Sequence, residues 1–175
     1  MVVGLGNPGP GYVETPHNVG FKVAEELARR WERPKPKKKF AGELSEGRTA
    51  PGGPRVALLK PRTFMNEAGR SAGPARGSFK LGLDRVLVLH DEIDLPFGEI
   101  RTRLGGGLAG HNGLKSLKRE LGSPDFHRVR IGVGRPDSTD PDIVAAYVLG
   151  RWRQSSAEVA GLIARAADEA ERVIG

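Results

Sequence analysis

The chain has 175 residues, no cysteine and a net charge of +7, with 28 lysines and arginines against 21 aspartates and glutamates. This length suits a single domain spanning residues 1–175, and no apolar run approaches the roughly 20 residues of a membrane span. The lack of cysteine excludes disulfides and thiolate chemistry, no secretory signal is visible, and we therefore expect a cytoplasmic protein whose positive charge suits a polyanionic partner.

The chain opens with a predicted strand over Val2 to Leu5, which runs into a glycine-rich turn. Glycines at positions 4, 6 and 9 have the spacing of a dinucleotide-binding fingerprint, but the prolines and glycines that follow prevent a helix from starting there. Apolar residues at helical spacing instead predict a helix over about Pro16 to Arg33, with Thr15 as its N-cap. We therefore favour a reactive site at this junction, with Asn7 and His17 exposed.

Strand-like and helix-like segments then alternate along the chain. The segment Pro34 to Lys39 is interpreted as a cationic break. Further strands are expected over Phe40–Arg48, Arg55–Lys60, Arg85–His90, Glu99–Leu104 and His127–Arg135, and further helices from Asn66 onward, over His111–Leu121 and over Ser155–Ile174. This order predicts a single-domain α/β fold, with a twisted, mixed and mostly parallel sheet that carries helices on both faces.

Asp91 is expected just past the end of the central apolar strand, and Asn7 follows the first strand. Ligands of open α/β sheets bind at the carboxyl ends of strands, so we expect these residues and His17 to lie together. The helix dipole favours a neutral His17 ring, and a bond from one ring N–H to Asp91 would leave the other nitrogen free to deprotonate water. No nucleophilic serine or cysteine stands out, so the pair is predicted to activate water directly.

These residues also allow two other interpretations. A histidine at a helix start is often only a surface or capping residue. The carboxylates from Asp91 to Asp94 also suggest Mg²⁺ or Mn²⁺. However, His90 continues an apolar strand and Pro96 closes a turn, so the carboxylates need not converge and we expect no metal.

Five glycines between positions 105 and 113 predict a mobile loop that closes over a ligand. It leads into a helix whose first turn holds His111 and Asn112. Basic residues flank the loop and form either a phosphate-binding rim or a solvated charged face: Arg101, Arg103, Lys115, Arg128 and Arg130.

Three asparagines, Asn7, Asn66 and Asn112, stand at element boundaries. An amide carries both a donor and an acceptor, so these side chains suit a peptide backbone or an attacked carbonyl. Capping a helix or a turn is the more common use of asparagine.

Together, these motifs resemble the bacterial peptidyl-tRNA hydrolase family. They occur in the family's order between about Val3 and Pro136: Gly4–Gly9, Tyr12, Thr15–Gly20, Lys60–Pro61, Thr63–Asn66, Asp91–Gly98, Arg101, Gly105–Leu114 and Arg128–Gly134. The resemblance implies a monomeric α/β enzyme of translation that hydrolyses the ester between a peptide and the 3′ end of tRNA. It further implies that the enzyme needs no metal or cofactor and binds neither DNA nor membranes.

The resemblance also implies roles for individual residues. His17 would be the general base and Asp91 its orienting partner. The asparagines Asn7, Asn66 and Asn112 would position substrate and oxyanion, Tyr12, Met65 and His111 would line the peptide cleft, and Arg101, Arg103, Lys115 and Arg130 would contact tRNA phosphates. The alternative is an RNA-binding module of the same fold, against which the intact His17, Asp91 and Asn7 weigh.

Overall fold

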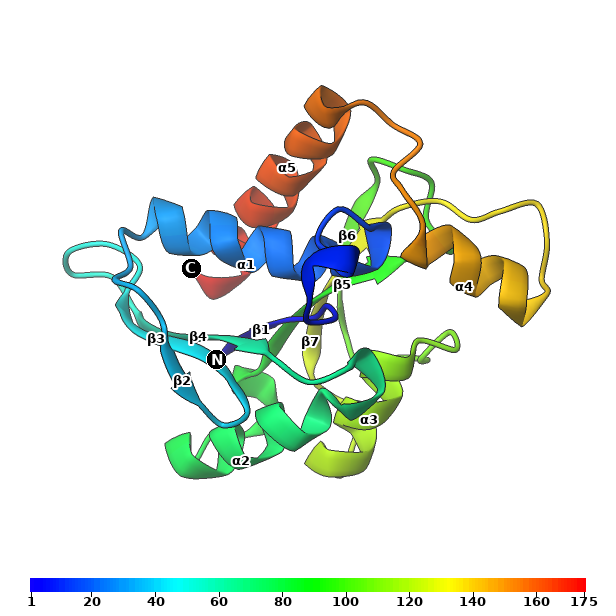
Figure 1. The fold of residues 1–175 in the computed structure, drawn as a ribbon. Coiled ribbons are helices and arrows are strands. Elements are labelled where there is room, and N and C mark those ends of the chain that lie inside the picture. Colours follow the sequence, from blue (N-terminus) through cyan, green and yellow to red (C-terminus); the bar gives the residue numbers. More distant parts are fainter.

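The computed structural model describes residues 1–175 and contains one seven-stranded sheet with the order β2-β3-β4-β1-β5-β7-β6 (Figure 1). The strands are β1 (Val2–Gly4), β2 (Lys37–Lys39), β3 (Gly42–Arg48), β4 (Arg55–Pro61), β5 (Leu87–Glu92), β6 (Ile100–Leu104) and β7 (His127–Gly132). The central strands β4, β1, β5 and β7 are parallel, and the other three pair antiparallel toward the edges. This confirms the predicted α/β fold with a mixed, mostly parallel sheet.

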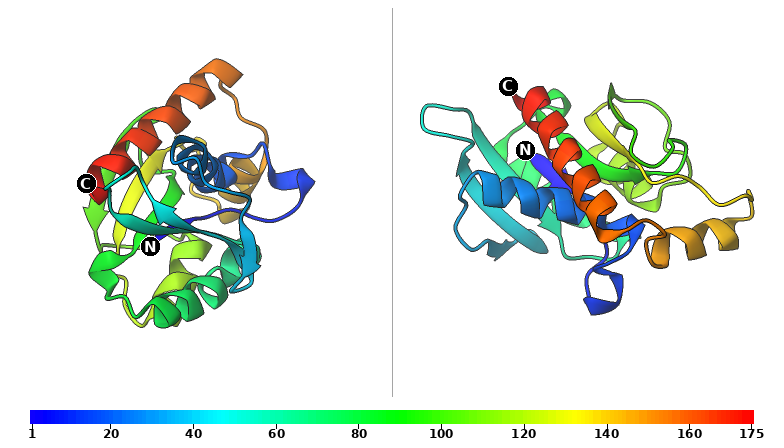
Figure 2. Two further views of the ribbon diagram at one scale, coloured as in Figure 1. Left: turned by 90° about the vertical axis from the view of Figure 1, so that its left-hand side faces the viewer. Right: turned by 90° about the horizontal axis from the view of Figure 1, so that it is seen from above.

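Helices cover both faces of the sheet (Figure 1 and Figure 2). On one face lie α1 (Val19–Arg30) and α5 (Ser156–Ile174), and on the other lie α2 (Gly69–Phe79) and α3 (Asn112–Leu121). Successive β5 residues alternate between the faces, so Leu89 belongs to the first hydrophobic core and Val88 to the second. No helix is both long and apolar enough to cross a membrane.

Two predictions around the first helix are wrong. His17 lies on a short 3₁₀ turn, η2 (Pro16–Asn18), and α1 begins only at Val19. Thr15 does not cap a helix, because its hydroxyl donates to the carbonyl of Tyr12 at 2.7 Å. His17 is therefore held by a tight turn rather than by the first turn of an α-helix.

Three other elements differ from the predictions. Lys37–Lys39 form the edge strand β2 instead of a break, because they pair with β3 across a tight turn. Asp91 lies inside β5 rather than past its end. A helix that the sequence did not predict, α4 (Pro141–Leu149), projects from the carboxyl end of the sheet and packs against η2.

The opening glycines allow β1 and α1 to pack closely. A Cβ atom on Gly4 would lie 2.5 Å from the Gly20 carbonyl oxygen, and one on Gly20 would lie 2.3 Å from the Leu89 carbonyl oxygen. No side chain fits at such distances, so both positions require glycine. The glycine spacing that imitates a nucleotide fingerprint therefore serves packing at this end of the sheet.

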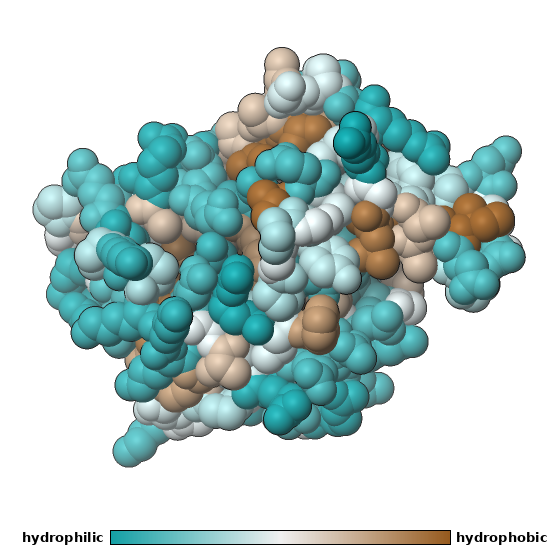
Figure 3. All heavy atoms as spheres, in the orientation of Figure 1, coloured by the Kyte–Doolittle hydropathy of each residue, from teal (hydrophilic) through white to brown (hydrophobic).

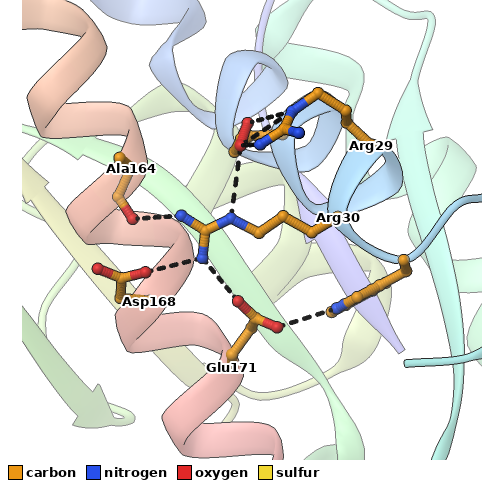
Figure 4. Close-up of polar contacts among 7 residues, drawn as sticks. Arg29, Arg30, Ala164, Asp168 and Glu171 are labelled. Carbon is orange, nitrogen blue, oxygen red and sulfur yellow. Dashed lines mark hydrogen bonds and ion pairs between the residues drawn. The ribbon is translucent and has the colours of Figure 1, made fainter. Parts of the chain in front are cut away.

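Arg30 joins α1 to α5 (Figure 4). Its guanidinium donates to Asp168 at 2.7 Å, to Glu171 at 2.6 Å and to the carbonyl of Ala164 at 3.1 Å. The indole N–H of Trp31 also donates to Glu171, at 3.3 Å. This network fixes the helix pair on the face of the sheet that carries His17.

We expect Arg30→Met to lower the free energy of unfolding by about 1–2 kcal/mol, because it removes several charge-assisted bonds between two helices. The effect is limited because Asp168 is 67% exposed to solvent. Urea unfolding measures the difference, and Arg29→Met is the matched control because Arg29 pairs only with Glu26 of its own helix. Equal losses in the two variants would contradict a link between helices.

Candidate active site

Asp91 and His17 form the centre of the site. Asp91 is 3% exposed and lies near the carboxyl end of β5, and η2 places the His17 ring against it. The Nδ1 atom of His17 lies 2.8 Å from Oδ2 of Asp91. The structure therefore brings together the two residues that the sequence predicted to pair. It corrects one detail, because the His17 side chain is 12% exposed rather than freely exposed.

A second histidine, His111, bonds to the other oxygen of the same carboxylate. Its Nε2 lies 2.8 Å from Oδ1 of Asp91. The backbone N–H groups of Gly113 and Leu114 donate to its Nδ1 at 3.1 and 3.3 Å, so His111 is the N-cap of α3. Because Nδ1 accepts these bonds, the ring proton is on Nε2 and His111 donates to Asp91.

These bonds determine the protonation of the group. Burial alone would raise the pKa of Asp91, but the two imidazole donors outweigh it and hold that pKa far below its usual value. Asp91 is thus an ionised acceptor, His17 donates from Nδ1, and the Nε2 lone pair of His17 is free. Burial would lower the pKa of His17, but the charge and hydrogen bond of Asp91 raise it above 6.5. The two effects of Asp91 together therefore outweigh burial in setting the pKa of His17.

His90 supports this arrangement from the α3 face of the sheet. Its ring packs edge-on against His111, with 5.3 Å between centroids, and its Nδ1 donates to the Asp91 carbonyl at 2.8 Å. Burial lowers the pKa of His90 to about 3, so the ring is neutral. The His90 ring therefore supports the position of the His111 ring by packing against it, and it places no charge near Asp91.

Asn7 is also buried, at 7% exposure, rather than exposed as predicted. The backbone N–H of Met65 donates to its Oδ1 at 2.7 Å, so the Nδ2 group is left as a donor. The amide of Asn18 bonds to both backbone groups of Asn7, at 2.9 and 3.0 Å. Asn18 thus holds the backbone of Asn7, and Met65 orients its side-chain amide.

A cleft of about 480 Å³ opens onto the histidine pair. It lies between the glycine-rich loop and α4, and Asn112 and Lys115 line it together with His17, Asp91 and His111. Apolar residues of α4 form the opposite wall, and Figure 3 shows strongly apolar side chains over this helix. Asn7 lines a separate hollow of about 220 Å³. Asn66 is exposed, and neither it nor Tyr12 lines either hollow.

Four of the predicted basic residues occupy facing positions on β6 and β7, and the fifth, Lys115, lies on α3. Arg101 lies opposite Arg130, and Arg103 lies opposite Arg128. Like charges in such positions repel, and an anion placed between them relieves the repulsion. Arg101 pairs with Glu99, and Arg130 pairs with Glu92 at 3.0 Å.

Arg128 does not belong to the phosphate-binding rim that the sequence suggested. It is 2% exposed, and its guanidinium donates to the carbonyls of Gly107 at 2.6 Å, Gly106 at 3.2 Å and Pro124 at 2.9 Å. Arg128 therefore ties the glycine-rich loop to β7. Movement of that loop stays a prediction.

The site also contains a potential set of metal ligands. One ligand atom each from His17, Asp91 and His111 lies within 4.8 Å of the others, and two imidazoles with a carboxylate suit Zn²⁺ or Fe²⁺. However, ligating histidines donate a proton from their second nitrogen, and Nδ1 of His111 instead accepts two backbone bonds. A metal on its Nε2 would leave the ring without any proton, so these residues fit a hydrogen-bonded triad better than a metal centre.

Three features of the site were not anticipated. They are the bond from His111 to Asp91, the support of Asn7 by Asn18, and the 57% exposure of Phe64, which precedes Met65. The only available signals were the position of Asn18 directly after His17 and an aromatic residue between two motif residues. Neither signal identifies a bonding partner.

The whole chain, residues 1–175, matches the family described as peptidyl-tRNA hydrolase. A peptidyl-tRNA hydrolase of Mycolicibacterium smegmatis is 49% identical over 177 residues, covering 99% of this chain and 90% of the relative. One of Geobacter metallireducens is 50% identical over 162 residues, covering 93% and 80%. The crystal structure of a point variant of the Acinetobacter baumannii peptidyl-tRNA hydrolase is similar with a TM-score of 0.87, at 38% identity over 98% of this chain and 85% of that chain.

Proposed function

The chain belongs to the peptidyl-tRNA hydrolase family and is a hydrolase of ester bonds, and we propose that His17 is the general base that activates water against the ester of peptidyl-tRNA. The observation that carries this proposal is the Asp91 carboxylate, which accepts a bond from each of two histidines. It leaves the Nε2 atom of His17 unprotonated and, with the ring lining the cleft, available to substrate.

The reaction that these groups support has two steps. Nε2 of His17 takes a proton from water as the hydroxide adds to the ester carbonyl carbon, and the carbonyl oxygen becomes an oxyanion. The bond from that carbon to the ribose 3′ oxygen then breaks, and His17 returns the proton to this oxygen. Asp91 stays ionised throughout and stabilises the imidazolium that forms between the two steps.

The asparagines supply neutral hydrogen-bond donors. The Nδ2 group of Asn7 is directed by its bond from Met65, and Asn112 lines the cleft beside His111. A donor held as Asn7 is held stabilises a developing oxyanion without first having to reorient, whereas Asn112 is exposed. Asn66 is exposed and so suits the substrate outside the cleft, as do Tyr12 and the aromatic Phe64.

Met65 and His111 also hold other groups of the site in place, and His111 lines the cleft as the family resemblance implies. Met65 is 4% exposed and acts on the site through its backbone N–H, which orients Asn7. Both nitrogens of His111 are engaged, which suits it to position Asp91 rather than to bind peptide.

The test is release of an N-blocked peptide from peptidyl-tRNA by the purified protein in the presence of EDTA. Turnover that is lost in His17→Ala would support a metal-independent hydrolase that uses His17. tRNA binding without turnover would instead favour the RNA-binding module. Activity that appears only with added Mg²⁺ would contradict the hydrogen-bonded triad.

The pH dependence of kcat/KM should report the pKa of His17. The base must be neutral, so activity falls as the pH is lowered through that pKa. Because Asp91 raises the pKa of His17 above 6.5, the decline should begin at a higher pH than for an unperturbed histidine. Rates measured between about pH 5 and 9 test this. A decline centred below 6.5 would contradict the assigned pairing.

Arg103→Ala and Arg130→Ala should raise KM by about three- to tenfold with little change in kcat, because each removes one contact to RNA phosphate. Arg130→Ala should also destabilise the fold, because Glu92 is 6% exposed and loses its partner. KM measured at about 50 and 200 mM salt distinguishes a lost charge contact, whose effect weakens as salt rises, from a changed shape of the binding surface. Unchanged KM in both variants at both salt concentrations would exclude phosphate contacts here.

A further inference from the structure

A dense positive charge on β2 is not used by the site described above. Lys35 and Lys37 to Lys39 are all exposed, and we call these four residues the lysine strand. None of them forms an ion pair within 4.0 Å. The nearest carboxylate across the strand pair, Glu43, is directed to Lys60 and Arg62 instead. The lysine strand therefore carries uncompensated charge.

The lysine strand ends at the same edge of the sheet as the active site. Lys39 pairs with Gly42, and Gly42 pairs with Pro61 at the carboxyl end of β4, which is parallel to β1 and β5. Four strand spacings separate β2 from β5, or roughly 20 Å. In Figure 3, hydrophilic side chains cover most of this part of the molecule, on the left where β2 lies.

The turn after the lysine strand is held in a strained conformation. Phe40 and Ala41 both have left-handed backbone angles, with φ of 55° and 50°, at positions where such turns usually contain asparagine or glycine. The Phe40 ring packs edge-on against Phe79, and the ammonium group of Lys39 lies 5.1 Å from the centre of the Phe40 ring. The strand is therefore presented from a fixed turn rather than from a loose loop.

A backbone bond connects this turn to the segment that orients Asn7. The N–H of Arg62 donates to the Ala41 carbonyl at 2.9 Å. The chain then passes through the exposed Phe64 to Met65, whose N–H orients Asn7. A positively charged surface with an exposed aromatic residue between it and the site is the arrangement that proteins use to follow a nucleic acid strand.

We propose that the lysine strand binds the phosphate backbone of the tRNA part of the substrate, away from its ester end. This inference rests on the proposed function, since that function supplies the polyanion. Lys37 and Lys39 project to the same side of the strand about 7 Å apart, a spacing that suits successive phosphates. As the outermost strand of the sheet, β2 also has one backbone edge without a neighbouring strand, so the N–H groups that point away from β3 are available to phosphate oxygens.

The test replaces all four lysines: Lys35→Gln, Lys37→Gln, Lys38→Gln and Lys39→Gln in one variant. At about 50 mM salt, KM for peptidyl-tRNA should rise at least about tenfold, and its salt dependence should weaken. kcat should not change. An N-acetylaminoacyl ester of adenosine has no phosphate and does not reach β2, so its kcat/KM should be the same in the variant and the wild type.

The matched control removes the same charge at the opposite end of the sheet: Arg48→Gln, Arg55→Gln, Lys80→Gln and Arg85→Gln. Arg48 and Arg55 pair there, and Arg55 and Arg85 line one hollow with Leu81, the residue after Lys80. An equal rise in KM in the control would overturn the proposal, because net charge alone would then explain it.

Two further outcomes separate the remaining explanations. Unchanged KM combined with aggregation of the lysine variant would overturn the proposal and show that the lysines only protect a sheet edge. A wild type that hydrolyses neither substrate would overturn the proposed function, and the inference with it. Hydrolysis of both substrates, with KM changed only for peptidyl-tRNA and only in the lysine variant, supports both.

Discussion

Replacing His17 with alanine should lower kcat by about 10²–10⁴-fold, the usual contribution of a positioned general base. Nε2 of His17 is the only ring nitrogen of His17 and His111 that does not already form a hydrogen bond. His111 cannot replace it, because both of its nitrogens are engaged by Asp91 and by the start of α3. Single-turnover hydrolysis with enzyme in excess measures the loss at the chemical step.

The binding of tRNA should survive this substitution, because the basic residues of β6 and β7 do not contact His17. His127→Ala is the matched control, since His127 lines a hollow at the opposite end of the sheet. That variant should retain the wild-type kcat. Joint loss of turnover and of tRNA binding in His17→Ala would indicate misfolding or a binding role, and would contradict the assignment of His17 as the base.

The sequence was sufficient to predict the strands that form the centre of the sheet. The apolar run around Val88 is typical of a strand buried on both faces, and alternation identified β7. By contrast, α4 has nine residues with apolar side chains on several sides, from Ile143 to Leu149, and so lacks the polar face that marks a helix in a sequence. The helix projects beside the cleft, where it packs against η2 and its Tyr147 hydroxyl donates to the Val133 carbonyl at 2.7 Å.

The pairing of His17 with Asp91 was predictable because ligand sites of open α/β sheets lie at the carboxyl ends of the strands, where both residues occur. The bond from His111 to Asp91 was not, since it depends on the His111 ring capping α3 through Nδ1, which turns Nε2 toward Asp91. Arg128 and Arg130 illustrate the same limit. Alternation puts them on one face of β7, but the carbonyls of the glycine-rich loop bury one, and Glu92 pairs with the other. Such contacts between distant segments leave no periodic signal.

Asp91→Asn should reduce kcat by about 10³–10⁴-fold, although it preserves the size and shape of the side chain. An amide offers one acceptor and one donor, but His17 and His111 both donate to Asp91. His111 cannot reverse its role, because two backbone N–H groups hold its Nδ1 as an acceptor. His111 therefore donates to the oxygen of the new amide, and the amide NH₂ group is left to donate to Nδ1 of His17. The proton of His17 moves to Nε2, which can then no longer accept a proton from water.

This explanation makes a second, less obvious prediction. Adding His111→Asn to Asp91→Asn should restore part of kcat, because asparagine still caps α3 and the amide at position 91 becomes free to present its oxygen to His17. Single-turnover rates of the wild type, both single variants and the double variant complete the cycle, and thermal unfolding checks that each is folded. A double variant no faster than Asp91→Asn would show that Asp91 acts mainly through its charge. A faster one would show that its two hydrogen bonds select the reactive tautomer of His17.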